Sequence, residues 1–223
     1  MIEKIMKAVK SSNKRRGRNI TIGAVVGFLL SCTAVMGADS YLWIKEDSGE
    51  IKFSTTGDNG NWNEKNPYEN AGNIWDKDTE PKTYTNNITL SSNGNNGKNT
   101  NGNDISYGLR LSGDLTGVNF INNGSIIGIM NDESSSNSYG SVSGYGIYND
   151  SSTIGDIRNA GVISGTSTNG TGIHNASGIG KKMGNITNEG VISGSGISTG
   201  GNGEGYGIYN GAKMGDIENT GLI

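Results

Sequence analysis

The 223-residue sequence contains one Cys, two Pro and one His, and only 32% of its residues are hydrophobic. Ordinary globular domains contain about 45–50% apolar residues, so the composition argues against a conventional enzyme core of packed Leu, Val and Phe. A single Cys excludes an internal disulfide. Charged residues are also few, at 17%, and the net charge of −3 is smaller than disordered chains usually carry. The chain is therefore expected to fold, but around a thin core.

Gly and Asn are abundant instead, with 38 and 30 copies. Together with Ser, Thr and regularly placed Ile and Val, they are typical of many short strands joined by turns. The length allows one or two domains.

The N-terminus has the pattern of an export signal. Residues 1–19 contain seven basic residues against one acid, an apolar run follows from Ile20 to Met36, and small residues come next. This order predicts a helical secretory signal peptide that is cleaved after Gly37 or Ala38. A retained membrane anchor is the alternative, but the run of 17 residues is at the lower limit for crossing a bilayer.

Cys32 gives a further alternative, because Leu29-Leu30-Ser31-Cys32 loosely resembles a lipoprotein box. Leu two positions before the Cys is a poor match, and better cleavage residues follow. Cleavage after Ala38 leaves 11 basic and 20 acidic residues, a net charge of −9. Such an acidic product offers no phosphate-binding surface, so nucleic acid is not an expected partner.

The segment MIEKIMKAVKSSNKRRGRNITIGAVVGFLLSC resembles the extended signal peptide of large Gram-negative autotransporters, the type V secretion family. The resemblance implies export by the inner-membrane machinery. It also implies display on the cell surface through a C-terminal barrel that the outer-membrane assembly machinery inserts. No such barrel segment occurs in these 223 residues, and the last repeat stops at Leu222-Ile223. The expectation is therefore the N-terminal portion of a longer passenger, or a periplasmic product if the chain truly ends there.

The remainder divides into two parts. Residues 39–105 hold all three Trp and both Pro, with short strands expected at 41–44 and 50–54 and an Asn/Gly-rich linker at 93–104. We interpret this part as a cap that covers the first exposed end of an array, which repeat proteins need. Residues 106–223 form the array.

Two sub-motifs repeat in that array. One is Gly-Ile-aromatic-Asn, with His once in the aromatic place, at 146–149, 172–175 and 207–210. The other is apolar-Gly-Asp/Asn-Ile-x-Asn-x-Gly-apolar-Ile, at 154–163, 183–192 and 214–223, with a degenerate copy near 120–128. Equivalent Asn residues lie 37, 29 and 31 positions apart, and loops of different length absorb the difference.

The repeats predict an all-β fold, a right-handed parallel β-solenoid in which each short strand pairs with its equivalent above and below. A helical repeat is excluded because Gly and Asn are poor helix formers. Equivalent side chains are expected to stack in ladders, with the amides hydrogen-bonding along the stack. The expected ladders are Ile147, Ile173 and Ile208; Ile157, Ile186 and Ile217; and Asn159, Asn188 and Asn219.

Catalytic patterns are nearly absent. The sequence has a single His, His174, at the repeat position that Tyr148 and Tyr209 occupy in other copies. We interpret it as a variable, outward-facing position, because a general base would need a partner oriented nearby. Asp156 and Asp216 share a repeat position, but Asn185 interrupts their row. With one His and no Cys after cleavage, no zinc site of the usual kind is expected, and no cofactor either.

Two classes of function remain. The first is a non-catalytic, surface-displayed passenger with a structural or adhesive role, an adhesin that binds host or bacterial surfaces. The alternatives are a secreted solenoid hydrolase acting on polysaccharide, which requires clustered carboxylates, and a cell-envelope lipoprotein anchored through Cys32.

Overall fold

The computed structural model describes residues 40–56, 61–98, 103–130, 142–151, 153–197 and 203–223. All of them belong to one compact unit, Asp39–Ile223. The predicted signal peptide, its cleavage sites Gly37 and Ala38, and Cys32 lie outside the described residues. The described part is all-β with mostly parallel sheets, and its one helical element is the 3-10 turn η3 (Glu69–Ala71).

The strands form four sheets, which we name A to D. Sheet A contains β1 (Leu42–Asp47), β2 (Glu50–Ser54), β6 (Gly97–Lys98), β7 (Asp104–Ser112), β11 (Ser143–Asn149), β15 (Asn169–Asn175) and β19 (Glu204–Asn210). Sheet B contains β3 (Ile74–Asp76), β4 (Lys82–Asn86), β9 (Val118–Asn122), β13 (Ile157–Asn159), β17 (Ile186–Asn188) and β21 (Ile217–Asn219). Sheet C contains β5 (Thr89–Asn93), β10 (Ser125–Ile129), β14 (Val162–Ser167) and β18 (Val191–Gly196). Sheet D contains β8 (Asp114–Leu115), β12 (Thr153–Ile154), β16 (Lys182–Met183) and β20 (Lys213–Met214).

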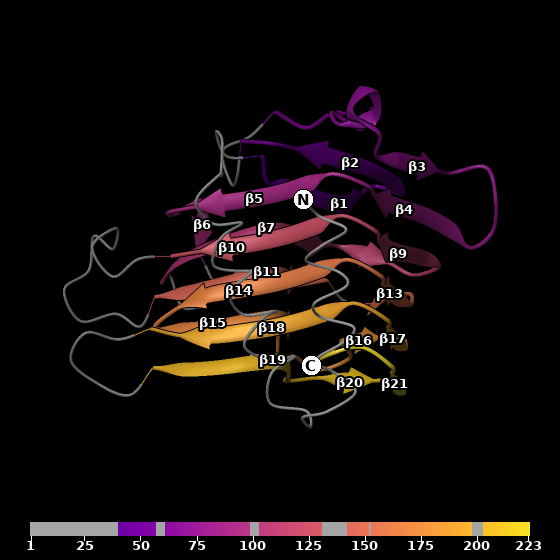
Figure 1. The fold of residues 1–223 in the computed structure, drawn as a ribbon. Coiled ribbons are helices and arrows are strands. Elements are labelled where there is room, and N and C mark those ends of the chain that lie inside the picture. Colours follow the sequence, from indigo (N-terminus) through magenta and orange to yellow (C-terminus); the bar gives the residue numbers. More distant parts are fainter. Residues whose placement is uncertain (1–39, 57–60, 99–102, 131–141, 152, 198–202) are drawn as a thin grey trace, which may run out of the picture. The chain divides into compact units, whose positions relative to one another are not determined.

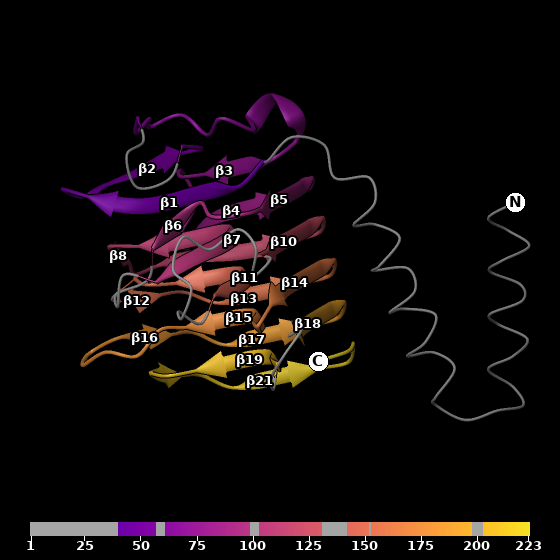
Figure 2. The same cartoon turned by 90° about the vertical axis from the view of Figure 1, so that its left-hand side faces the viewer.

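From β7 onward the chain passes through sheets A, D, B and C in that order and then returns to sheet A. We call one such passage a circuit. Each strand pairs in parallel with the strand of the same sheet in the neighbouring circuits, as β11 does with β7 and β15. Successive circuits therefore lie on top of one another, which gives the layered arrangement in Figures 1 and 2.

The first strands differ from the later ones in direction. β1, β4 and β5 pair in parallel with β7, β9 and β10, so they already belong to the parallel sheets. β2 and β3 instead run antiparallel to β1 and β4 and are the outermost strands at this end of sheets A and B. Two antiparallel strands thus cover the first parallel strands, at the indigo end of the ribbon in Figure 1.

The core lies between the sheets and is built from columns of equivalent side chains. Ile147, Ile173 and Ile208 are in register on sheet A, as expected, and Leu42 and Leu109 extend their column toward the N-terminal end. Ile173 is fully buried, and its replacement by Ala would cost about 2–5 kcal/mol. The column is continuous because a parallel in-register pairing repeats each side chain directly above its equivalent.

A second column follows sheet B. Ile157, Ile186 and Ile217 are in register there, and Phe120 and Tyr84 precede them. The aromatic members sit in the earlier circuits, where the ring of Tyr84 lies 6.4 Å from that of Phe120 and 6.2 Å from that of Phe53. Ile217, in the last circuit, is 45% exposed.

Candidate functional site

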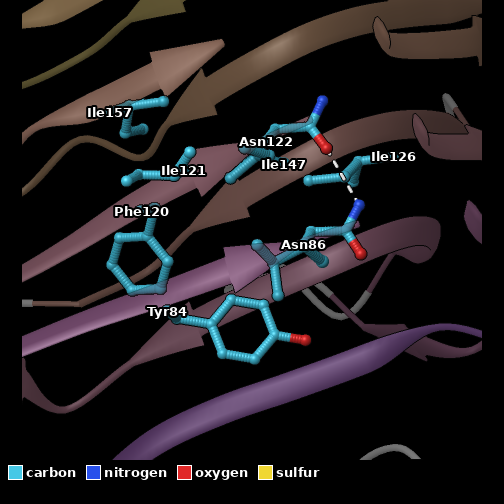
Figure 3. A pocket seen from close by; sticks show the side chains of 9 residues that line it. Tyr84, Asn86, Phe120, Ile121, Asn122, Ile126, Ile147 and Ile157 are labelled. Atoms are coloured by element: carbon cyan, nitrogen blue, oxygen red, sulfur yellow. Dashed lines mark hydrogen bonds between the residues drawn. The ribbon is translucent and has the colours of Figure 1, made fainter. Parts of the chain in front are cut away.

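A ladder of buried Asn side chains follows the corner between sheets B and C. In each step the Nδ2 of one Asn donates to the Oδ1 of its equivalent in the next circuit, at 2.7–2.9 Å. Figure 3 shows the first of these bonds. The predicted members are joined as expected, and two earlier residues extend the ladder. It consists of Asn86, Asn122, Asn159, Asn188 and Asn219.

A second Asn ladder, which sequence reasoning missed, lies at the ends of the sheet A strands. Asn149 donates through Nδ2 to the Oδ1 of Asn175 at 2.7 Å, and Asn175 donates to Asn210 at 2.6 Å. Each of these residues is the final Asn of the Gly-Ile-aromatic-Asn motif. The repetition of that motif in the sequence could therefore have revealed this ladder. In the preceding circuit Leu111 occupies this register position, and Ser151 donates to the Oδ1 of Asn149 instead.

At the acidic repeat position, the side chains of Asn119, Asp156 and Asn185 each accept a hydrogen bond from the next circuit. Oδ1 of Asp156 accepts the backbone N–H of Asn185 at 2.7 Å, and Oδ1 of Asn185 accepts that of Asp216 at 2.9 Å. Asn119 begins the series by accepting the N–H of Asp156. Either Asp or Asn can occupy this position, because the side chain contributes only an acceptor oxygen to the hydrogen bond. Gly184 precedes Asn185 because a Cβ there would overlap the Oδ1 of Asp156.

His174 belongs to a column of planar side chains on the outer face of sheet A. The column contains Trp43, Arg110, Tyr148, His174 and Tyr209, one from each of five neighbouring strands. The guanidinium of Arg110 lies 4.0 Å from the centre of the Trp43 ring, and the His174 and Tyr209 rings stack at 4.9 Å and 9°. His174 therefore points away from the main core, yet its neighbours cover most of it.

Burial among these rings has electrostatic consequences. Desolvation is the main cause that lowers the pKa of His174 to about 4; Asp150 opposes this shift, and Lys181 adds to it. Desolvation also raises the pKa of Tyr148 above its ordinary value. Asp150 lies at the edge of the column, 2.8 Å from the Lys181 ammonium and 3.4 Å from the Arg110 guanidinium. The imidazole is therefore neutral at pH 7.

A small enclosed cavity lies in the core beside the first Asn ladder (Figure 3). Its volume is about 10 Å³, and its lining is mostly apolar, with Leu109, Phe120 and Ile147 among the contributors. A space of this size holds at most a single water molecule, so it is too small for a substrate. Within the described ranges no group of three His, Asp or Glu side chains is placed to hold a metal ion.

No protein-family model, curated protein or solved structure matches this chain. Within the described residues, no helix combines the length and the apolar character needed to cross a bilayer.

Proposed function

We propose that the chain is an exported passenger of the autotransporter type, a right-handed β-solenoid with a structural or adhesive role on the bacterial surface and no catalytic activity. The circuits through sheets A, D, B and C are its coils. A right-handed path follows from the strong preference of parallel strand connections for that hand. Export rests on the basic and apolar residues of 1–38 and on their resemblance to the extended signal peptide.

The observation that carries the proposal is the in-register stacking of equivalent side chains through every circuit. Such an array repeats its chemistry at each level, which suits a rigid rod better than a unique active centre. Two of the side chains that resembled catalytic groups, Asp156 and His174, have structural partners. Asp156 accepts a backbone N–H of the next circuit, and His174 is enclosed between aromatic rings. These contacts favour the structural interpretation over a polysaccharide hydrolase.

Display on the surface is tested on intact cells of the organism that encodes the chain. An antibody against residues 153–197 should label intact cells, and external protease should remove the signal without releasing periplasmic markers. Labelling that appears only after lysis would contradict display.

Adhesion is tested with the purified chain. It should bind to host or bacterial cells and to extracellular matrix in a saturable manner. Turnover of a glycan without cell or matrix binding would instead support the hydrolase.

A further inference from the structure

Three adjoining hollows lie at the end of the stack that carries β2 and β3 (Figure 1). The middle hollow, of about 220 Å³, is lined by Ile51 and Trp75 among others. It shares Trp75 with a neighbour of about 310 Å³ and Ile51 with a third hollow of about 250 Å³. We call this continuous surface the hollows beside Trp75.

The indole of Trp75 borders two of the hollows and is only partly covered. Its ring packs edge-on against Phe53, with the ring centres 5.9 Å apart and the planes at 72°, which fixes its orientation. Among the described residues, no acceptor reaches the indole N–H. The fold therefore leaves a fixed aromatic ring and one hydrogen-bond donor for a ligand, and such a ring is a platform for another flat apolar surface.

The lining carries charges of both signs. The carboxylates that border the hollows are those of Glu46, Glu50, Glu64, Glu69 and Asp114, and the ammonium groups are those of Lys65, Lys77 and Lys82. An anionic ligand would meet the carboxylates and a cationic ligand the ammonium groups, and such like-charge contacts weaken binding. A ligand without charge avoids both, and its hydroxyl groups can donate to carboxylates and accept from ammonium groups.

Three of these charged side chains are not used by the fold. Within the described part of the chain, the side chains of Glu64, Lys77 and Lys82 have no hydrogen-bond or ion-pair partner. The other charged groups of the lining each have a partner within the protein. The groups left for a ligand are therefore one carboxylate that accepts hydrogen bonds, and two ammonium groups and the indole N–H that donate them.

We propose that the hollows beside Trp75 bind a neutral oligosaccharide, a chain of sugars that carries no ionised group. The C–H face of one pyranose ring packs on the indole, as apolar surfaces do on aromatic rings. The carboxylate of Glu64 accepts hydrogen bonds from sugar hydroxyl groups, and the ammonium groups of Lys77 and Lys82 donate to them. The adjoining hollows give room for successive sugars. The inference rests on the proposed adhesive function and deepens it by naming the chemistry of the ligand.

The test is calorimetric titration of the purified chain with β-linked hexamers of glucose, mannose, xylose and N-acetylglucosamine. Hexamers of galacturonate and of glucosamine are the anionic and cationic controls. At least one neutral hexamer should bind about tenfold more tightly than both charged controls. Its affinity should stay nearly constant as salt rises from about 0.05 to about 0.5 M, because the ligand forms no ion pair.

The double variant Glu64→Ala/Lys77→Ala removes two exposed side chains that have no partner in the fold. It should lose about tenfold in affinity for the neutral hexamer, because hydrogen bonds to two charged groups are lost. The matched control is Lys213→Ala/Glu218→Ala, which removes an exposed Lys and an exposed Glu from β20 and β21 at the other end of the stack. The control should leave the affinity unchanged.

Trp75→Phe tests the aromatic platform while keeping a ring against Phe53. It removes the indole N–H and part of the flat surface, so it should weaken binding of the neutral hexamer about threefold or more. Glu64 and Lys77 are exposed, so the double variant keeps the test valid even if Trp75→Phe folds poorly.

Equal or tighter binding of a charged control would overturn the proposal, as would the absence of binding to every neutral hexamer. An equal loss of affinity in the double variant and in its matched control would also overturn it, because the site would then lie elsewhere. Unchanged adhesion of the double variant to cells would leave the adhesive function standing but remove the hollows from it. A wild-type chain that binds the neutral hexamer but neither cells nor matrix would contradict the adhesive function alone.

Discussion

The Nδ2 of Asn159 donates a 2.8 Å hydrogen bond to the Oδ1 of Asn188, its equivalent one circuit further along the chain. The same Nδ2 lies 3.2 Å from the carbonyl oxygen of Gly161 and 3.1 Å from that of Val191. Both Asn side chains are fully buried. Each Asn side chain accepts a hydrogen bond through Oδ1 from the preceding circuit and donates one through Nδ2 to the next. Identical Asn residues can therefore satisfy one another's hydrogen-bonding groups along a stack of any length. This explains why Asn recurs at this corner whatever the length of the intervening loops.

Asn159→Asp should therefore be strongly destabilising, although the side chain keeps its shape. The substitution removes the donor and places two oxygens against the Oδ1 of Asn188 and the carbonyl oxygens of the corner. We expect a loss of about 3 kcal/mol or more in the free energy of unfolding, measured by urea denaturation at pH 7.

Asp156→Asn is the matched control, three residues away. Because Asp156 contributes only an acceptor oxygen and Asn185 does the same in the next circuit, the denaturation midpoint should not move. A similar loss in both variants would show that the ladder direction is not what stabilises the corner.

Gly161→Ala should also destabilise, for a steric reason. A Cβ on Gly161 would overlap the carbonyl oxygen of Gly124 in the preceding circuit, and backbone there cannot move without opening the stack. We expect a loss above about 3 kcal/mol, seen as a lower thermal midpoint. Gly178→Ala is the comparison, since the nearest atoms to its Cβ would be side-chain carbons of Lys181 rather than backbone atoms. Equal effects would contradict the steric explanation.

The direction of the Asn ladder predicts unequal effects at its first two members. No donor among the described residues reaches the Oδ1 of Asn86, whereas that of Asn122 accepts from Asn86. Asn122→Ala breaks the ladder in the middle and leaves Asn159 without its donor. Asn86→Ala breaks one ladder bond, to the Oδ1 of Asn122, and removes an acceptor that is already unsatisfied, whereas Asn122→Ala breaks two ladder bonds. Urea denaturation should show Asn122→Ala to be more destabilising by about 1–2 kcal/mol.

The periodic part of the fold could be read from the sequence because stacking makes each column a repeat of one residue type. The Ile columns and the Asn159 ladder follow directly from the spacing of their motifs. Asn86 was missed, although Tyr84-Thr85-Asn86-Asn87 parallels Phe120-Ile121-Asn122-Asn123. The signal was present, but it lay in a segment dominated by Trp, Pro and charge.

The planar column on sheet A could not be read in the same way. The motif position shared by Tyr148, His174 and Tyr209 shows only its later part. Trp43 and Arg110 differ from that motif, and only the strand register brings Trp43 over Arg110. The hollows beside Trp75 are still less accessible to sequence reasoning. They are formed where β2, β3 and residues 61–72 fold over the end of the stack, and among the described residues no later circuit repeats those contacts.

His174 should make the stability of the stack depend on pH. Its pKa is about 4 in the folded chain, below the value of about 6.5 for an unfolded His. Between these values the unfolded chain binds more protons, so stability falls as pH drops from about 6.5 to about 4, and below pH 4 the contribution of the neutral His174 is fully lost. The shift corresponds to at most about 3 kcal/mol.

His174→Tyr places in this circuit the residue that Tyr148 and Tyr209 supply in its neighbours. Tyr is uncharged throughout this range, so the variant should be as stable as the wild type at pH 7 and more stable at pH 5. His174 is the only His in the chain, so the difference between the two unfolding profiles at pH 5–7 isolates its titration. Equal slopes in both proteins would mean that the imidazole can be protonated within the stack, stabilised by the faces of Tyr148 and Tyr209 through a cation–π contact. The column would then tolerate a cation at His174 as it does at Arg110, whose guanidinium lies against Trp43.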